Sequence, residues 1–358
     1  MKKKDISRRK FMGKTVAGIG LGVVGATTTA CTKQLNPASD RETRRRGVKV
    51  ATVDLQHLVN QKTIEGRIQS TLGRMEKAAA YQPDIICLVE TFNRMFVEEE
   101  STYKGIAEDE VSPGPVTSRM GEFAKSTGCY VVCPIVTKNN GRLYNSCVLI
   151  DRQGSIAGIY HKAHPVDTET QNGEGIIPGP VRPPVFDTDF GKIGMQICFD
   201  ANWFNSWDYL KEDGAEIVFF PSAFSGGKMI NFHAWKNNYY VVTSTADDAR
   251  IIDISGIDID SSSFQIGYTW ASLNLEKEYV PTFPGKYRIP DIQEKYGDRV
   301  KIKVFRDIGG GAGYGAGHIT IESLDPDLFV RDILKEFEIP VHREELKEAE
   351  EFQARYRP

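Results

Sequence analysis

The sequence lacks several features that would assign a protein to a broad class at once. It has only 6 cysteines in 358 residues and no CxxC pair, so neither a zinc ribbon nor a dense disulfide framework is expected. The formal net charge of -3 gives no general case for binding nucleic acid or an anionic membrane surface. No apolar run is long enough for a stable membrane span. We also find no internal repeat and no low-complexity block.

The first 31 residues have the pattern of an export signal. Paired Arg8 and Arg9 precede a short apolar, glycine-rich run at residues 16–26, which is typical of the twin-arginine route. Cys31 follows Ala30 as in a lipoprotein cleavage site, but Thr28 occupies a position where such sites prefer leucine, so lipidation of Cys31 stays open. We expect an exported, periplasmic protein, attached to a membrane only if Cys31 carries a lipid.

Residues 32–46 contain almost no apolar side chains and a run of arginines. This composition predicts a disordered tether, and its charge needs no nucleic-acid partner to explain it. The roughly 300 residues that follow are enough for one large α/β domain with a deep core.

The body of the chain alternates strand and helix patterns. The predicted strands are 48–54, 84–89, 130–136, 143–151, 155–160, 216–221, 241–245 and 250–253. The predicted helices are 60–81, 116–126, 203–213 and 232–240. Asn139-Asn140-Gly141 predicts a hairpin turn. The fold class is therefore α/β with hairpins inserted among the βα units.

Three residues with useful chemistry each follow a predicted strand. Glu90 ends one apolar run, Lys162 follows another, and Cys198 lies where the run Ile193–Ile197 meets a turn. Each has a plain structural explanation on its own: a surface acid, a solvated lysine and a buried core cysteine. Together, in this order and each just beyond a strand, they are a much more specific signal than any one of them alone.

At these residues the sequence resembles the nitrilase superfamily of carbon-nitrogen hydrolases. The resemblance rests on residues 83–90, Tyr160-His161-Lys162, residues 194–200 and residues 220–224, and it covers about residues 48–255. It implies a four-layer α-β-β-α sandwich with a single catalytic domain, which we place at residues 47–322. It also implies a homodimer or a higher homo-oligomer.

The resemblance further implies a Glu-Lys-Cys triad of Glu90, Lys162 and Cys198. A second glutamate is expected between the lysine and the cysteine; we prefer Glu174 and keep Glu169 as the alternative. In this scheme Cys198 forms an acyl-enzyme, Glu90 carries the proton and Lys162 stabilises the oxyanion. No metal or cofactor is required.

The expected substrate is a small amide or an N-carbamoyl amine. Its pocket wall is predicted to include Phe199, whose backbone N–H would face the oxyanion, with Asn202, Trp203 and Phe224. The sequence of residues 200–204 differs from the motif common in many members of the superfamily. We therefore do not infer a dicarboxylate monoamide as the substrate.

Two other functions remain as alternatives. A metal-dependent hydrolase would use histidines such as His161 and His164, which lie close together in one loop. A catalytically silent exported binding protein would share the fold without the reaction. The intact Glu90, Lys162 and Cys198 argue against it.

The C-terminal part carries fewer signals. Residues 279–287 have a loop-like composition, and Gly309–Gly317 is a glycine-dense stretch of open role. Residues 332–355 predict one amphipathic helix within a helical tail at 323–358, packed on the domain or on a partner subunit.

Overall fold

The computed structural model describes residues 47–58, 61–262, 266–281, 288–305 and 318–357. The predicted signal at residues 1–31, the predicted tether at 32–46 and Gly309–Gly317 lie outside these residues.

The first sheet contains seven strands, and its main path runs in the order β13-β1-β2-β4-β5-β6. Its strands are β1 (Gly47–Val53), β2 (Ile85–Cys87), β3 (Glu108–Asp109), β4 (Tyr130–Asn139), β5 (Arg142–Ile150), β6 (Ile156–His161) and β13 (Tyr268–Asn274). β1, β2 and β4 are parallel, whereas β5 is antiparallel to both β4 and β6. β6 therefore runs in the same direction as β2, so residues that follow these two strands lie at the same edge of the sheet.

The second sheet contains six strands in the order β12-β11-β10-β9-β8-β7. These are β7 (Phe186–Asp187), β8 (Lys192–Met195), β9 (Ile217–Ser222), β10 (Tyr240–Thr245), β11 (Ala249–Ile252) and β12 (Asp258–Ser261). β8, β9 and β10 are parallel, and the nucleophile candidate Cys198 follows β8.

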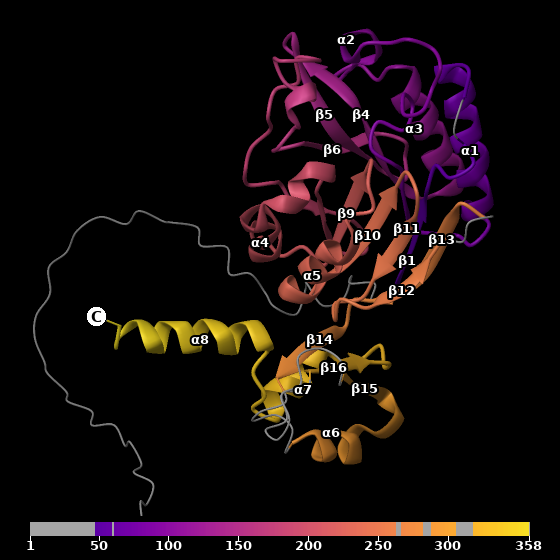
Figure 1. The fold of residues 1–358 in the computed structure, drawn as a ribbon. Coiled ribbons are helices and arrows are strands. Elements are labelled where there is room, and N and C mark those ends of the chain that lie inside the picture. The colour runs from indigo at the N-terminus through magenta and orange to yellow at the C-terminus, as the bar shows by residue number, and fades with distance from the viewer. Residues whose placement is uncertain (1–46, 59–60, 263–265, 282–287, 306–317, 358) are drawn as a thin grey trace, which may run out of the picture. The chain divides into compact units, whose positions relative to one another are not determined.

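Three apolar cores show that the two sheets and their helices form four layers. One core joins inward side chains of both sheets, such as Val50 and Cys87 with Met195 and Phe219. Alternate residues of the first sheet, such as Ala51, pack instead on α1 (Ile64–Ala79) and α3 (Pro115–Thr127). The outer face of the second sheet packs on α4 (Phe204–Glu212) and α5 (Gly227–Asn237). Figure 1 shows these helix pairs on opposite sides of the sheets. This confirms the predicted α-β-β-α sandwich.

Residues after β13 form a small unit with a core of its own. Its sheet has the order β14-β16-β15, from Lys277–Pro281, His318–Ser323 and Val300–Phe305. The helices are α6 (Ile289–Tyr296), α7 (Val330–Glu336) and α8 (His342–Ala354). Side chains such as Val280, Ile321, Ile333 and Leu334 build the core. The boundary that we predicted at residue 322 falls at the end of β16, inside this unit.

Two predictions for this C-terminal part are wrong. Residues 279–281 belong to strand β14 rather than to a loop, because Tyr279 and Val280 pair with Thr320 and Ile319. The single helix predicted over residues 332–355 is two helices that are interrupted before His342, where Pro340 disfavours a continuous helix. α7 buries an apolar face, whereas α8 has no buried residue.

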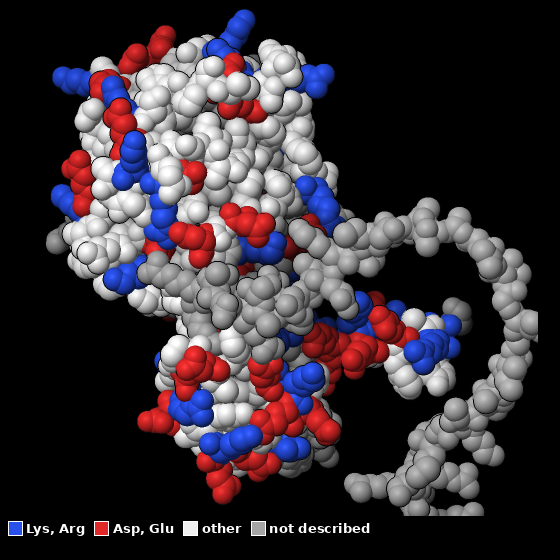
Figure 2. Space-filling view, turned by 180° about the vertical axis from the view of Figure 1, so that it is seen from behind, with Lys and Arg blue, Asp and Glu red and all other residues white. Residues whose placement is uncertain are grey.

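Most other elements lie within a few residues of their predicted ranges. Several elements were not predicted, namely α2 (Tyr103–Ile106), α6 and the strands β3, β7, β12, β13, β15 and β16. Cys87, Cys129, Cys133, Cys147 and Cys198 are all buried and free. Within the described ranges, no helix has the length and apolarity needed to cross a membrane. On the face in Figure 2, basic and acidic side chains of the described residues are mixed and form no single basic patch.

Candidate active site

Cys198 begins a tight helical turn directly beyond β8. The turn covers Cys198–Asn202, and the Cys198 backbone has a φ of 48°, a left-handed conformation that costs energy for a residue with a Cβ. Cys198 is only 9 % exposed. A rigid parallel sheet thus holds a thiol at a strained strand-to-turn junction, as predicted.

Glu90 lies beyond β2, at the edge of the first sheet where Lys162 follows β6. Its Oε1 accepts hydrogen bonds from Lys162 Nζ at 2.8 Å and from Asn145 Nδ2 at 2.9 Å. Its Oε2 accepts one from the backbone N–H of Ala223 at 2.9 Å, which follows β9 in the opposite sheet. The carboxylate is 4 % exposed, so it contacts groups from both sheets inside the protein.

The Lys162 ammonium lies between two buried carboxylates. It donates to Glu90 and, at 2.7 Å, to Glu169 Oε2. The backbone N–H of Val166 also donates to Glu169 Oε2, at 2.9 Å, and Asn145 Nδ2 donates to Glu169 Oε1 at 2.6 Å. Asn145, a residue of β5 that we did not predict, therefore bridges the two carboxylates.

Our preference for Glu174 over Glu169 does not match this geometry. Glu174 pairs with Arg94 at 2.9 Å and accepts a hydrogen bond from the backbone N–H of Tyr103 at 2.9 Å. The structure places Glu169, the alternative that we had kept, beside Lys162. A short turn at Asp167–Glu169 follows the Lys162 loop closely enough to return this carboxylate to the ammonium.

Burial and neighbouring charges determine the ionisation of the site. Burial, followed by the charge of Glu90, raises the pKa of the Cys198 thiol to about 12, whereas Lys162 and the Ala223 backbone N–H lower it. Burial alone would lower the pKa of Lys162, but the charges of Glu90, Cys198 and Glu169 hold this pKa above its usual value. In the free protein the site is therefore a neutral thiol beside an ammonium that is paired with carboxylates, and the thiol needs a base.

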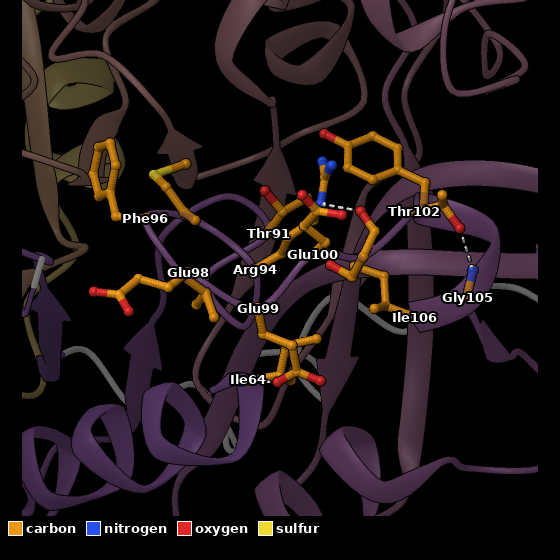
Figure 3. Close-up of a pocket in the computed structure, with 14 residues that line it drawn as sticks. Ile64, Thr91, Arg94, Phe96, Glu98, Glu99, Glu100, Thr102, Gly105 and Ile106 are labelled. Carbon is orange, nitrogen blue, oxygen red and sulfur yellow. Dashed lines mark hydrogen bonds between the residues drawn. The ribbon is translucent and has the colours of Figure 1, made fainter. Parts of the chain in front are cut away.

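A cavity of about 1140 Å³ is lined mainly by the loop that follows Glu90. It is lined by Thr91, which follows Glu90, and by Arg94 and Tyr103, with Glu98 and Glu99 farther along the same loop (Figure 3). Burial and the charges of Glu169 and Glu90 raise the pKa of Tyr103 to about 12. Tyr103 in the cavity wall therefore senses the charge of both carboxylates, although Glu90, Glu169 and Cys198 are not themselves in the wall.

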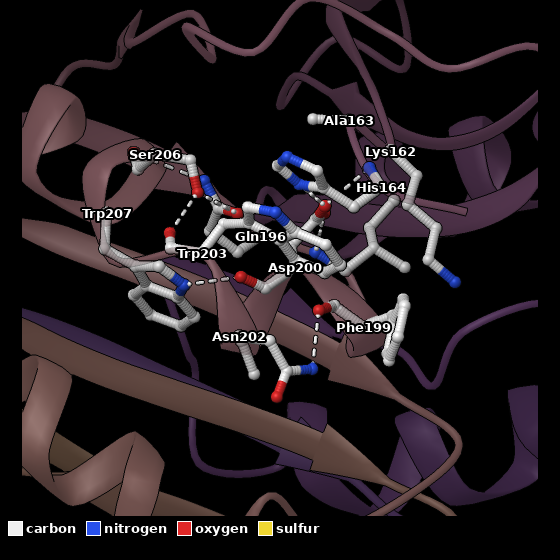
Figure 4. A network of polar contacts seen from close by, with 12 residues as sticks. Lys162, Ala163, His164, Gln196, Phe199, Asp200, Asn202, Trp203, Ser206 and Trp207 are labelled. Atoms are coloured by element: carbon white, nitrogen blue, oxygen red, sulfur yellow. Dashed lines mark hydrogen bonds and ion pairs between the residues drawn. The ribbon is translucent and has the colours of Figure 1, made fainter. Parts of the chain in front are cut away.

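Asp200 connects the nucleophile turn to the loop that follows Lys162. It is fully buried and accepts hydrogen bonds from the backbone N–H groups of Ile197 at 3.0 Å and His164 at 2.9 Å, and from Tyr160 Oη at 2.7 Å. The His164 ring also lies 2.9 Å from Asp200 Oδ1 (Figure 4). Asp200 thereby fixes the position of the Cys198 turn relative to Lys162.

The four predicted substrate-binding residues lie close to these loops. Phe199 and Phe224 are 36 % and 39 % exposed. Asn202 Nδ2 donates to the carbonyl of Phe199 at 3.0 Å, within its own turn. Trp203 stacks on the His164 ring with 3.9 Å between ring centroids. The surface beside Cys198 is therefore largely aromatic, which suits a ligand with an apolar part.

The histidines that we considered as metal ligands have other partners. His161 Nδ1 lies 2.8 Å from Ser146 Oγ, and His164 contacts Asp200 and Trp203. In the part of the chain that the structure describes, no three His, Cys, Asp or Glu side chains are grouped to hold a metal ion.

The family model for carbon-nitrogen hydrolases matches residues 49–257, more than half of the sequence. The chain belongs to the carbon-nitrogen hydrolase family. The match ends before β14, so the small C-terminal unit lies outside it.

The curated relatives match this family member over part of their length. It is 28% identical over 162 residues to a deaminated glutathione amidase of Synechocystis sp., covering 38% of this chain and 60% of the relative. It is 37% identical over 111 residues to an N-carbamoylputrescine amidase of Arabidopsis thaliana, covering 30% of this chain and 37% of the relative. The matched segments thus span at most about 60% of these two relatives.

Solved structures support the same fold. Saccharomyces cerevisiae Nit3, a member of the nitrilase superfamily, has a TM-score of 0.57 at 18% identity and covers 70% of this chain and 96% of its own. An amidase from Nesterenkonia sp. has a TM-score of 0.54 at 14% identity and covers 65% and 93%. At these identities the likeness shows the fold alone.

Proposed function

We propose that this protein hydrolyses a small amide or N-carbamoyl amine through a Cys198 acyl-enzyme. The observation that supports this most is that Glu90 and Lys162, which follow β2 and β6, are hydrogen-bonded and both act on the buried Cys198 thiol after β8. The relatives named as amidases favour the same class of reaction.

The proposed first step transfers the Cys198 proton to Glu90 while the sulfur attacks the substrate carbonyl carbon. The Lys162 ammonium and the Phe199 backbone N–H stabilise the oxyanion, a contribution of about 10²–10³ in rate per donor in other enzymes. Glu90 then protonates the leaving ammonia or amine, which leaves a thioester. In the second step Glu90 takes a proton from water, the hydroxide adds to the thioester, and the Cys198 thiol is released with the acid.

In this scheme Glu169 and Asn145 act by position. Asn145 donates hydrogen bonds to Glu90 and to Glu169, and Glu169 accepts one from Lys162. Together they keep the ammonium directed at the reacting carbonyl. The partly exposed aromatic side chains Phe199 and Phe224 provide the apolar wall of the substrate site.

Covalent trapping tests the proposal. In one variant of the Nesterenkonia amidase, the acetamide moiety of fluoroacetamide adds to the active-site cysteine, so fluoroacetamide is a suitable probe here. We expect one adduct on Cys198, located by peptide mass spectrometry, and none in Cys198→Ala. Ammonia release from a panel of amides and carbamoyl amines should be lost in the same variant. A Cys198→Ala protein that still hydrolyses its substrate would exclude the mechanism.

We also propose that the protein is exported and assembles with copies of itself. Export rests on Arg8 and Arg9 and is tested by fractionation of cells that carry Arg8→Lys and Arg9→Lys; retention in the cytoplasm is expected. Assembly is suggested by α8, where Leu346 and Phe352 are 55 % and 59 % exposed. A chain that ends at Val341 should have a smaller assembly mass by light scattering; an unchanged mass would exclude α8 as the contact.

A further inference from the structure

A second cavity lies where the end of α4 meets the C-terminal unit. Its volume is about 150 Å³, and it is lined by residues of α4, β14, α7 and α8. The charged ones are Lys211, Glu278, Arg331, Arg343, Glu344 and Lys347. None of them belongs to the proposed active site.

Both acidic side chains of this cavity, Glu278 and Glu344, are paired with Arg331. Arg331 Nε donates to Glu278 Oε1, and Arg331 Nη1 donates to Glu344 Oε1 at 2.7 Å. One arginine thus accounts for both carboxylates of the cavity wall. The remaining charged groups of the wall are all cations.

The described residues give none of those remaining cations an ion pair, although Asp208, Glu212 and Glu278 attract Arg343 from farther away. Lys211 Nζ donates to the backbone carbonyl of Asn238 at 2.8 Å, which neutralises no charge. Among the described residues, the side chains of Arg343 and Lys347 form neither a hydrogen bond nor an ion pair. Arg343 and Lys347 are four positions apart on α8 and therefore lie on one face of that helix. Arg343 and Arg331 also repel the Lys211 ammonium and lower its pKa, and a bound anion would offset that repulsion.

We propose that this cavity binds a small, doubly charged oxyanion of the phosphate or sulfate type. Arginine and lysine are the side chains that recognise such groups, through several charge-assisted hydrogen bonds. The volume suits the ligand, because one water molecule occupies about 30 Å³ in the liquid and the cavity offers several times that space. The oxyanion is either a free ion or the phosphate group of a small organic molecule.

Calorimetric titration of the full chain with sodium sulfate, at an ionic strength held constant with chloride, tests the proposal. We expect one saturable site. Arg343→Ala and Lys347→Ala should each weaken it about tenfold, equivalent to about 1.4 kcal/mol. Lys335→Ala is the matched control, since it removes an exposed lysine of α7 that is outside the cavity wall, and it should bind sulfate as the wild type does. Inorganic phosphate and glycerol phosphate, titrated in parallel, distinguish a free ion from a phosphate monoester.

The pH dependence gives a second readout. Burial lowers the pKa of Lys211 to about 8, with Arg343 and Arg331 lowering it further and Glu278 and Glu216 opposing them. Sulfate keeps its charge throughout this range, so affinity should fall as the pH rises through 8 and the ammonium loses its proton. The proposal is overturned if the wild type shows no saturable binding, if Lys335→Ala weakens it as much as Arg343→Ala, or if affinity is constant from pH 7 to 9.

Discussion

The substitution Glu169→Gln tests which carboxylate positions the lysine. Glutamine keeps the volume of the side chain but removes the charge that lies 2.7 Å from Lys162 Nζ. Because Val166 N–H, Asn145 Nδ2 and Lys162 Nζ all donate to Glu169, the new amide NH₂ group must face at least one donor. We expect a site that is both less stable and less well aligned.

The structure sets the size of the effect. At an effective dielectric constant of about 20, an ion pair at this distance has roughly 6 kcal/mol of Coulomb energy before solvation costs. Removing one partner of a buried pair costs about 3–5 kcal/mol. Since Glu90 still pairs with Lys162, we expect the lower end of that range. If the lost interaction is also used in the transition state, kcat/KM falls about a hundredfold.

Glu174→Gln is the matched control. The side chains of Arg94 and Glu174 are 32% and 26% exposed, and exposed pairs of this kind contribute about 0.2–1 kcal/mol. Its kcat/KM for ammonia release should fall less than about fivefold. Both variants are compared well below their unfolding temperatures, measured by circular dichroism. A nearly active Glu169→Gln protein beside an inactive Glu174→Gln protein would refute the assignment of Glu169.

Two further predictions concern titration. The Cys198 thiol has a pKa of about 12, raised by burial and then by Glu90, so alkylation by iodoacetamide should accelerate with pH without a plateau below pH 10. Glu90→Gln should shift this profile to lower pH, and a wild-type plateau near pH 7 would instead indicate a preformed thiolate. Burial lowers the pKa of His233 from 6.5 to about 4. As the pH falls, the unfolded chain therefore binds a proton at this histidine before the folded chain does. The free energy of unfolding should decrease by roughly 3 kcal/mol between pH 6.5 and pH 4. In His233→Phe the melting temperature should decrease less over that pH range. The variant should lose about 1 kcal/mol of stability at neutral pH, because the hydrogen bond to Ala201 is absent. An equal slope of melting temperature against pH in both proteins would contradict the prediction.

The sequence was most informative where burial imposes a pattern. The continuous apolar run of β2 and the spacing of Ile68 and Met75 in α1 predicted both elements, because these side chains pack on a core. It was least informative for β14, whose pairing with β16 joins segments that are far apart in the chain. Such long-range pairing leaves little local signal.

The lack of a local pattern also explains why the sequence did not identify which glutamate contacts Lys162. Glu169 and Glu174 lie five residues apart in one irregular loop, and loop residues have no periodicity from which a direction can be inferred. The motif resemblance favoured Glu174, whereas the hydrogen bonds of Lys162 and Asn145 favour Glu169. Asn145 was missed for a related reason: in the sequence it is one polar residue within an apolar strand, and only the folded chain shows that it contacts both carboxylates.

Asp200 shows how the fold limits where the reacting groups can lie. A carboxylate that is fully removed from water is costly unless donors surround it. Its donors come from β6, from the loop after Lys162 and from the residue before Cys198. Since all of them must be in place together, the Lys162 loop and the Cys198 turn cannot shift independently. The relative position of the ammonium and the thiol therefore depends on a side chain that need not touch the substrate.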